Sequence, residues 1–433
     1  MSDCMDDRAP QRLLPWRAMA TGGGLLDAQG RFRSTIFDET SAQAARHGAI
    51  NLGQGFPDED GPQVMLEAAA AAIGSGKNQY TPAVGSLALR QTVAAQQART
   101  QGRALDPDTE VLITVGAAEG LTAALLSTVS PGQDVVVLEP YYDLYAAVVS
   151  FVGANLRTIP LRPPAFRPQA EDIRAAFGPR TAAVVLNDPH NPTGTVLDPD
   201  TALLIAQQAI AHDAVIITDE VYEHLRFDGS HTSLAAAKDR SILLTGSGHQ
   251  MSETDRARLI TEITERTLVV SSASKTLRAT GWRIGWVTGP AELITGVRAV
   301  KTYLTHSPAA PLQDAVATGL QDPAWAGALA EQQGQRSHLV VNHLRALGLN
   351  VATPSGSYYV VADFRPLYER LGVTDSPGLS TALIEQAGVA LLPVAAFASA
   401  AHGELYDGWM RVAACKQTDT LEAAMQRLER HLV

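Results

Sequence analysis

Between residues 111 and 288, short runs of apolar and β-branched residues alternate with longer amphipathic segments. The apolar runs are predicted to be strands, and they cover residues 111–115, 134–138, 181–186, 214–218, 267–271 and 284–288. Helical periodicity lies between them, for example at residues 121–129, 199–212 and 291–305. Strands that alternate with helices imply a parallel sheet with helices on both faces. Ligands of such sheets bind beyond the carboxyl ends of the strands.

The segments on either side of this alternation predict a second, smaller unit. The sequence after residue 311 is rich in helical patterns, with strand candidates at residues 358–362 and 409–413. The first 35 or so residues contain Pro, Arg and Gly22-Gly23-Gly24, and predict an irregular or partly disordered arm. We therefore expect residues 1–50 to form this arm and part of the small domain, 51–310 a large domain and 311–433 a small C-terminal domain.

Charge and cysteine content narrow the class of protein. The net charge of -11 argues against a nucleic-acid-binding surface, which needs clustered basic residues. No apolar run approaches the roughly 18 residues of a membrane span, and the acidic N-terminus does not resemble a secretory signal. Cys4 and Cys415, the only cysteines, predict neither a disulfide framework nor a metal site. A cytoplasmic protein without membrane or nucleic-acid partners is expected.

Two loops at predicted strand ends have ambiguous roles. Gly116-Ala117-Ala118-Glu119-Gly120 joins a strand to a helix, where free backbone N–H groups suit a phosphate, although tight packing explains small residues equally well. The second loop runs from Asp188 to Gly194 and contains two prolines. Its Asn191 amide can donate a hydrogen bond to a ring oxygen, but a plain turn is the simpler interpretation.

Two ionisable residues follow the next predicted strands. Asp219 ends the run 214–218, where its carboxylate could pair with a protonated pyridine nitrogen or simply cap a helix. Lys275 follows the run 267–271 within Ser272-Ala-Ser274-Lys275. A lysine that is desolvated there could form a Schiff base, whereas an isolated lysine in a Ser-rich loop is usually a solvated surface residue.

The order and spacing of these motifs resemble those of class I aminotransferases of pyridoxal-5′-phosphate (PLP) fold type I. The matching motifs are Asn191-Pro-x-Gly, Asp219-x-x-Tyr222, Ser272-x-Ser274-Lys275 and Arg283. Asn51-Leu-Gly-Gln-Gly-Phe-Pro-Asp58 and Asn78-Gln-Tyr-Thr81 are similar to the branch of kynurenine aminotransferases, also called glutamine transaminase K. The run from Phe56 to Pro62 is most similar to actinobacterial N-succinyldiaminopimelate aminotransferases. The resemblance covers residues 34–430.

The resemblance implies an α/β fold of PLP fold type I, with a mostly parallel seven-stranded sheet between helices and a smaller α+β domain. It also implies a homodimer with shared active sites. Lys275 would be the Schiff-base lysine and proton shuttle, Asp219 the partner of the pyridine nitrogen, and Tyr222 and Asn191 the contacts to the ring hydroxyl. Other cofactor-binding positions would be Ala117, Ala118, Tyr142, Ser272, Ser274, Arg283 and, from the partner subunit, Tyr80. Substrate-binding positions would be Phe37, Gly55, Asn191 and Arg411, the last for the α-carboxylate. Without the resemblance, Arg411 would be expected to be an ordinary surface arginine.

Two departures from the family pattern bear on specificity. Between His231 and Glu265 the chain has roughly twenty extra residues, of which 252–264 predict a solvated helix or a disordered excursion. The segment from His306 to Pro311 lacks the Phe-His pair of kynurenine-type enzymes. Phe37, Tyr80 and Tyr303 would line a roomy, partly aromatic pocket, with His306 the only candidate cation for distal carboxylates.

The reaction expected from this resemblance is ping-pong transfer of an amino group between an L-α-amino acid and a 2-oxo acid. One alternative is β-elimination from cysteine-type conjugates, and another is a specialised biosynthetic transaminase for a basic or modified amino acid. A non-enzymatic PLP-binding regulator would need a DNA-binding module. The first 50 residues contain neither a helix-turn-helix pattern nor a basic cluster.

Overall fold

A seven-stranded sheet forms the centre of the fold in the computed structural model, which describes residues 14–432. The strand order is β2-β8-β7-β6-β5-β3-β4. Neighbouring strands from β4 to β7 pair in parallel, whereas β8 is antiparallel to both β2 and β7. The expected mostly parallel sheet is therefore confirmed, with β8 as its exception. The strands are β2 (Val111–Thr114), β3 (Asp134–Glu139), β4 (Asn155–Pro160), β5 (Thr181–Asn187), β6 (Val215–Asp219), β7 (Thr267–Ser272) and β8 (Gly285–Thr288).

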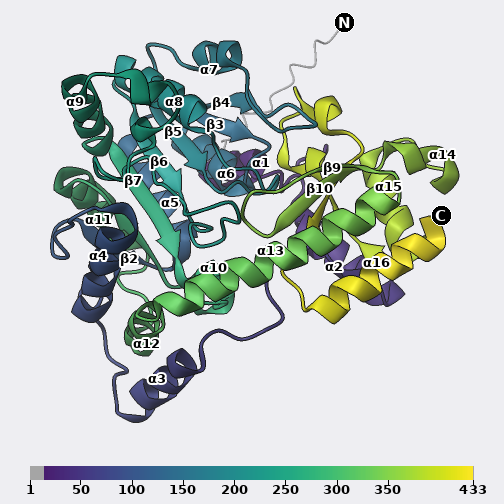
Figure 1. Cartoon of the computed structure of the whole chain (residues 1–433), viewed down its shortest axis with the longest axis horizontal. Coiled ribbons are helices and arrows are strands. Elements are labelled where there is room, and N and C mark those ends of the chain that lie inside the picture. Colours follow the sequence, from purple (N-terminus) through teal and green to yellow (C-terminus); the bar gives the residue numbers. More distant parts are fainter. Residues whose placement is uncertain (1–13, 433) are drawn as a thin grey trace, which may run out of the picture.

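Helices cover both faces of this sheet, as the alternating pattern predicted (Figure 1). Side chains of a strand point alternately to its two faces, and the two buried clusters follow that alternation. Val135 and Val137 pack with α5, α6 and α11, whereas Val136 and Leu138 pack with α7 and α8 on the opposite face. The helices of this region are α3 (Gln63–Gly74), α4 (Leu87–Gln101), α5 (Gly116–Thr128), α6 (Asp143–Val152), α7 (Ala170–Ala176), α8 (Pro199–Ala211), α9 (Glu253–Thr264), α10 (Ala273–Thr276), α11 (Ala291–Leu304) and α12 (Ala310–Leu320).

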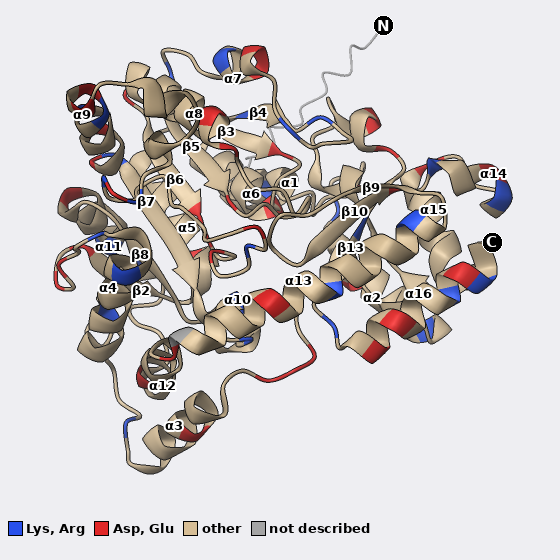
Figure 2. Cartoon of the chain, viewed as in Figure 1, with Lys and Arg blue, Asp and Glu red and all other residues tan. Residues whose placement is uncertain are grey.

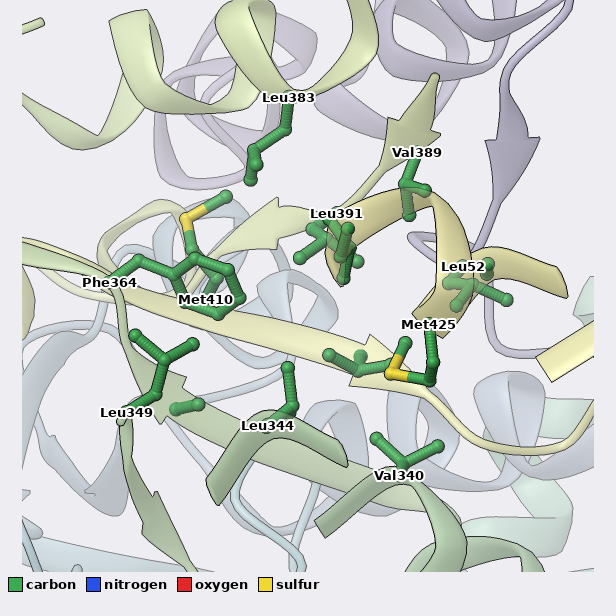
Figure 3. Close-up of a cluster of buried hydrophobic side chains, with 14 of the residues drawn as sticks. Leu52, Val340, Leu344, Leu349, Phe364, Leu383, Val389, Leu391, Met410 and Met425 are labelled. Carbon is green, nitrogen blue, oxygen red and sulfur yellow. The ribbon is translucent and has the colours of Figure 1, made fainter. Parts of the chain in front are cut away.

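A four-stranded antiparallel sheet of order β12-β13-β10-β9 forms the second structural centre. Its apolar core collects side chains of this sheet, α13 and α16, among them Leu344, Met410 and Met425 (Figure 3). Figure 1 shows α13 extending between the two sheets. The strands are β9 (Asn350–Ala352), β10 (Tyr359–Asp363), β12 (Leu392–Pro393) and β13 (Trp409–Ala413), and the helices are α13 (Pro323–Ala346), α14 (Tyr368–Leu371), α15 (Ser376–Ala382) and α16 (Thr418–Leu432).

The N-terminal part of the chain packs against both regions. Helix α2 (Ile36–His47) precedes β1 (Ile50–Asn51), which pairs in parallel with β11 (Val389–Ala390). This pairing joins the N-terminal region to the C-terminal one, while the domain bounds at residues 50 and 310 stay a prediction.

Figure 2 shows acidic and basic residues mixed along α13 and α16.

The expectation of an irregular arm over the first 35 residues is wrong for residues 15–22 and confirmed for residues 23–35, which form turns and an isolated bridge. Residues 15–22 form helix α1 (Pro15–Gly22), which packs on α6. Gly22 makes this close approach possible, because a Cβ atom there would lie 2.3 Å from the Ser150 Oγ. The Gly-rich signal therefore marked a helix contact rather than disorder. Residues 1–13, including Cys4, lie outside the described part of the chain.

The segment that exceeds the family pattern also has regular structure. Residues 253–264 form α9, so the expected solvated helix is confirmed and the disordered alternative is wrong. One face of α9 packs on the core of α8, with Ile263 buried and Leu259 and Ile260 half-buried. The preceding 3₁₀ turn, Gly246–Gln250, is tied to α8 because the Ser247 hydroxyl donates to Asp200 at 2.6 Å.

Candidate active site

A cavity of about 290 Å³ lies at the carboxyl ends of β5, β6 and β7. The structure brings together there all the sequence-predicted site residues except Tyr80. They are Phe37, Gly55, Ala117, Ala118, Tyr142, Asn191, Asp219, Tyr222, Ser272, Ser274, Lys275, Arg283 and Arg411. Four further residues that line the cavity were not predicted from the sequence: Leu121, Asn187, Val221 and Tyr359.

Lys275 lies on the short helix α10, directly after β7 ends at Ser272. Its Nζ atom is 3.5 Å from the Gly55 carbonyl oxygen and 5.4 Å from the ring centroid of Tyr358. Burial lowers the pKa of Lys275 to about 8, because the charged ammonium loses its water. A lysine with this pKa has a substantial neutral fraction near neutral pH, and it is the neutral amine that reacts with a carbonyl group.

Asp219 is the last residue of β6 and is 4% exposed. Burial raises the pKa of its carboxyl to about 6, although the Tyr145 hydroxyl donates to it at 2.5 Å. A cation beside this carboxylate would offset the cost of desolvation. Tyr145 was not predicted. The sequence did contain an indication that Tyr145 faces the site. Tyr145 follows the predicted site residue Tyr142 by three positions, and residues three apart share a face of a helix.

The position of Asn191 is fixed by Asn187, the last residue of β5. The Asn187 side chain accepts from the Asn191 backbone N–H at 2.6 Å and donates to the Asp219 carbonyl at 2.8 Å. One amide thus connects the ends of two neighbouring strands. A buried polar residue at the end of an apolar strand was the available sequence signal for Asn187.

Small residues meet an arginine at the N-terminus of α5. Gly116 to Gly120 were expected in a turn between strand and helix, but they form the first turns of α5. Gly116 has φ +70°, and a Cβ atom there would lie 2.5 Å from Arg283 Nη2. The backbone conformation therefore favours glycine, and the missing Cβ leaves room for the guanidinium in its present position. Free N–H groups of Ala117 and Ala118, with Arg283, make this end of the cavity suited to an anion.

Arg411 lies on β13 and is 1% exposed, which is opposite to the surface position that its residue type alone suggests. Its guanidinium donates to the Asn191 side-chain oxygen at 3.0 Å and to the Gly53 carbonyl at 2.6 Å. The centroids of two aromatic rings, Tyr359 and Phe397, lie 4.2 and 4.6 Å from it.

The charge of Arg411 is not neutralised by a salt bridge. Among residues 14–432, no carboxylate forms an ion pair with Arg411, and its Nε atom is buried without a hydrogen-bond partner. A buried and unpaired guanidinium is costly in free energy. An anionic ligand such as a carboxylate would remove this cost by binding both edges of the group.

Tyr80 lies apart from the cavity. It is 89% exposed, and its ring meets the ring of His306 edge-on, with centroids 5.6 Å apart. Tyr303 is likewise 92% exposed. In the single chain Phe37 reaches the cavity, whereas Tyr80 and Tyr303 do not. Because Tyr80 is expected to come from the partner subunit, the pocket lined by all three stays a prediction.

A larger cavity of about 350 Å³ lies beside the ends of β5 and β6, where it is lined by Leu186 and Thr218. Its charged residues pair with one another, as in Arg167–Asp198 at 2.9 Å and His231–Glu220 at 3.0 Å. Because these charges are already compensated, the smaller cavity with its unpaired Arg411 is the better candidate for an active site.

Across residues 14–432, no helix is long and apolar enough to cross a membrane.

Comparisons with known proteins agree with this geometry. Residues 47–428 match the family described as aminotransferase class I and II. The chain is 45% identical over 406 residues to a probable N-succinyldiaminopimelate aminotransferase DapC of Mycobacterium tuberculosis, covering 92% of this chain and 96% of that protein. It is 33% identical to the methionine aminotransferase of Escherichia coli, covering 91% and 95%.

Solved structures show the same relationship. The N-succinyldiaminopimelate aminotransferase of Mycobacterium tuberculosis superposes with a TM-score of 0.82 at 44% identity, covering 92% of this chain and 97% of that one. A further relative by sequence, the kynurenine–oxoglutarate transaminase of Dictyostelium discoideum, is 28% identical over 430 residues, covering 92% of this chain and 94% of that protein. The chain belongs to the class I and II aminotransferase family, and it is a PLP-dependent enzyme that moves an amino group between an amino acid and a 2-oxo acid.

Proposed function

We propose that the cavity around Lys275 is the site of this transamination and that Arg411 binds the α-carboxylate of every substrate. The observation that supports this most is the buried guanidinium of Arg411, which has no carboxylate partner among the described residues and lines the same cavity as Lys275. A bidentate carboxylate would supply the missing counter-charge. Any substrate bound in this way must be an α-amino acid or its 2-oxo acid.

The donor set of the cavity fits PLP. Lys275 offers a desolvated amine, and the buried carboxyl of Asp219, with its raised pKa, suits a protonated ring nitrogen. The N-terminus of α5 and Arg283 suit the phosphate. In this proposal Ser272, Ser274 and the backbone of Ala117 and Ala118 also hold the phosphate, Tyr142 stacks on the ring, and Asn191 and Tyr222 contact the ring hydroxyl.

Bound PLP supplies an electron sink for the negative charge that develops when the substrate loses its α-proton. The chain contributes the proton chemistry, because the Lys275 Nζ atom can take that proton and return it at a different carbon. Asp219 keeps the ring nitrogen protonated and so maintains the sink. Arg411 and Asn191 orient the substrate through its carboxylate, which brings the α-carbon to Lys275.

For the substrate, we propose N-succinyldiaminopimelate first, because a relative of that name shares 45% identity over nearly the whole chain. One observation favours a second candidate. The cationic side chains that line the cavity are Lys275, Arg283 and Arg411, and each already has a role in binding cofactor or α-carboxylate. A long uncharged or basic amino acid would not need a fourth cation for a distal carboxylate.

A comparison of kcat/KM values tests these candidates. The panel is N-succinyldiaminopimelate, glutamine, methionine, phenylalanine, kynurenine, arginine and aspartate, each with 2-oxoglutarate as acceptor. A preference of about 100-fold, or about 2.7 kcal/mol, for one compound identifies the side-chain class. If aspartate were the best substrate, the proposal of a long side chain would be rejected.

We also propose that the enzyme is a cytoplasmic homodimer with shared active sites. Tyr80 and Tyr303 are large aromatic residues that are 89% and 92% exposed in the single chain. Burial against a second subunit would remove this apolar surface from water. A partner subunit would then place Tyr80 at the phosphate end of the opposite site. A cytoplasmic location is consistent with the free, buried thiol of Cys415.

A further inference from the structure

Glu139, the last residue of β3, has a fully buried carboxylate with no role in the chemistry described so far. Both of its oxygens are used by a segment more than 250 positions away. One accepts from the Ser399 backbone N–H, and the other lies 2.6 Å from the His402 Nδ1 atom. We call this pair of contacts the Glu139–His402 clamp. It connects the seven-stranded sheet to the segment that follows β12.

Two further hydrogen bonds, both accepted by main-chain carbonyls, reinforce the clamp. The Tyr141 backbone N–H donates to the Phe397 carbonyl at 2.7 Å, and the Tyr406 hydroxyl donates to the Glu139 carbonyl at 2.7 Å. The end of β3 is therefore tied to the segment 397–406 at several points. Hydrogen bonds to a buried carboxylate are stronger than those between neutral groups, since their alternative is an uncompensated charge.

The clamped segment contains Phe397, which covers Arg411. The Phe397 ring centroid lies 4.6 Å from the Arg411 guanidinium and 5.9 Å from the Phe37 ring centroid, which it meets edge-on. On its N-terminal side the segment is fixed through β12, whose Leu392 pairs with Arg411 itself. The clamp fixes the other side, so Phe397 is held over Arg411 from both ends.

We propose that Glu139 and His402 are positioning residues for substrate binding, which act by holding Phe397 against the Arg411 guanidinium. This inference rests on the proposed role of Arg411. The aromatic ring restricts the guanidinium to one plane and keeps water from that face. A fixed orientation lowers the entropy lost when the carboxylate binds. The clamp therefore acts on the affinity for substrate rather than on proton transfer at Lys275.

The test compares His402→Ala with the unaltered holoenzyme. We expect KM for both the amino acid and the 2-oxo acid to rise by roughly tenfold, the size expected for losing a hydrogen bond to a charged group. We expect kcat to change by less than about threefold, since groups that move the proton are untouched. The dissociation constant of an α-methyl amino acid, which binds but lacks the α-proton, should rise in parallel with KM. Cofactor content and visible absorbance should not change.

The pair His343–Glu429 provides a matched control. Its Nδ1 to Oε1 distance is 2.5 Å, and the His343 side chain is 32% exposed, compared with 33% for His402. It joins α13 to α16 and does not line the cavity. His343→Ala should leave KM unchanged. It should lower the melting temperature less than His402→Ala does, because the Glu429 carboxylate is 36% exposed whereas that of Glu139 is fully buried.

A conservative replacement separates positioning from general packing. In His402→Asn, the side-chain amide can donate to Glu139 as Nδ1 does, so KM should return to within about threefold of the original value. If His402→Ala leaves KM and the dissociation constant unchanged, or if His343→Ala raises them equally, the proposal is wrong. Failure of the unaltered enzyme to transaminate any amino acid would instead reject the proposed function.

Discussion

Asp219 is the residue whose charge matters most for the proposed chemistry. Its carboxylate is 4% exposed and already accepts a hydrogen bond from Tyr145 at 2.5 Å. Asp219→Asn keeps the shape and this hydrogen bond but removes the charge. We expect the variant to fold and to lose about 1000-fold in kcat, or about 4 kcal/mol, because a neutral amide does not hold a proton on the ring nitrogen.

Steady-state kinetics and circular dichroism check this expectation together. Tyr145→Phe, which weakens the same site without removing the carboxylate, should lose only about tenfold. Near-normal turnover in a well-folded Asp219→Asn protein would reject the role of the carboxylate.

Lys275 gives a prediction about pH. Its pKa is lowered to about 8 by burial, against 10.5 for the ordinary side chain. The neutral amine is the reactive form, and its fraction increases as the pH rises through the pKa. Cofactor-free protein should therefore take up PLP covalently faster as the pH increases from about 6 to about 8, and should level off above that range. Stopped-flow absorbance measures the rate. A rate that keeps rising toward pH 10.5 would show a solvated lysine.

At the scale of elements, the chain has an extra segment before β7. Removing that segment tests how much the stability of the core depends on it. Residues 246–260 include a 3₁₀ turn tied to Asp200 and most of α9, where Leu259 and Ile260 are half-buried. Replacing residues 246–260 with a short Gly/Ser linker removes this modest apolar contact. It leaves the fully buried Leu243 and the 2% exposed Ile263 in place.

We expect this shortened protein to be soluble and loaded with cofactor, with a melting temperature lower by a few degrees, since the loss is roughly 1–2 kcal/mol. Size-exclusion chromatography and thermal melting measure this. Aggregation or loss of PLP would mean that the segment supports the core or a subunit contact.

The strands that the sequence predicted were those buried on both faces. All six apolar runs between residues 111 and 288 are strands, and each of these strands is buried or nearly so along its length, including β2 at one edge of the sheet. β4, at the opposite edge, was missed because its first four residues are alternately exposed and half-buried. Helix α1 was missed because its glycines indicate flexibility unless the contact partner on α6 is known.

Local sequence patterns predicted the site where residues follow strands, whereas Phe37, Gly55 and Arg411, from distant segments, were predicted only through the family resemblance. Asn191, Asp219 and Lys275 lie at strand ends, and such positions converge in any sheet of this type. Phe397 and Tyr359 pack on Arg411 from other parts of the chain, and no local pattern indicates that contact.

At the scale of the whole molecule, each active site of the proposed dimer would contain residues of both subunits. If Tyr80 reaches the partner's site, mixing Tyr80→Phe subunits with Lys275→Ala subunits creates one site with both residues and one with neither. Activity per heterodimer should then exceed that of either parent, provided that Tyr80→Phe alone is impaired. The heterodimer is isolated with two different affinity tags. If the isolated heterodimer shows no gain over the parents, the shared site is rejected.

The most direct test of the whole account is to locate the covalently bound cofactor. Borohydride reduction of the purified holoenzyme should abolish its visible absorbance and fix the cofactor to the protein. Peptide mass spectrometry should then place the added pyridoxyl mass on Lys275, and Lys275→Ala should remain unlabelled. Label on another lysine, or the same label in Lys275→Ala, would contradict the assignment of the active site.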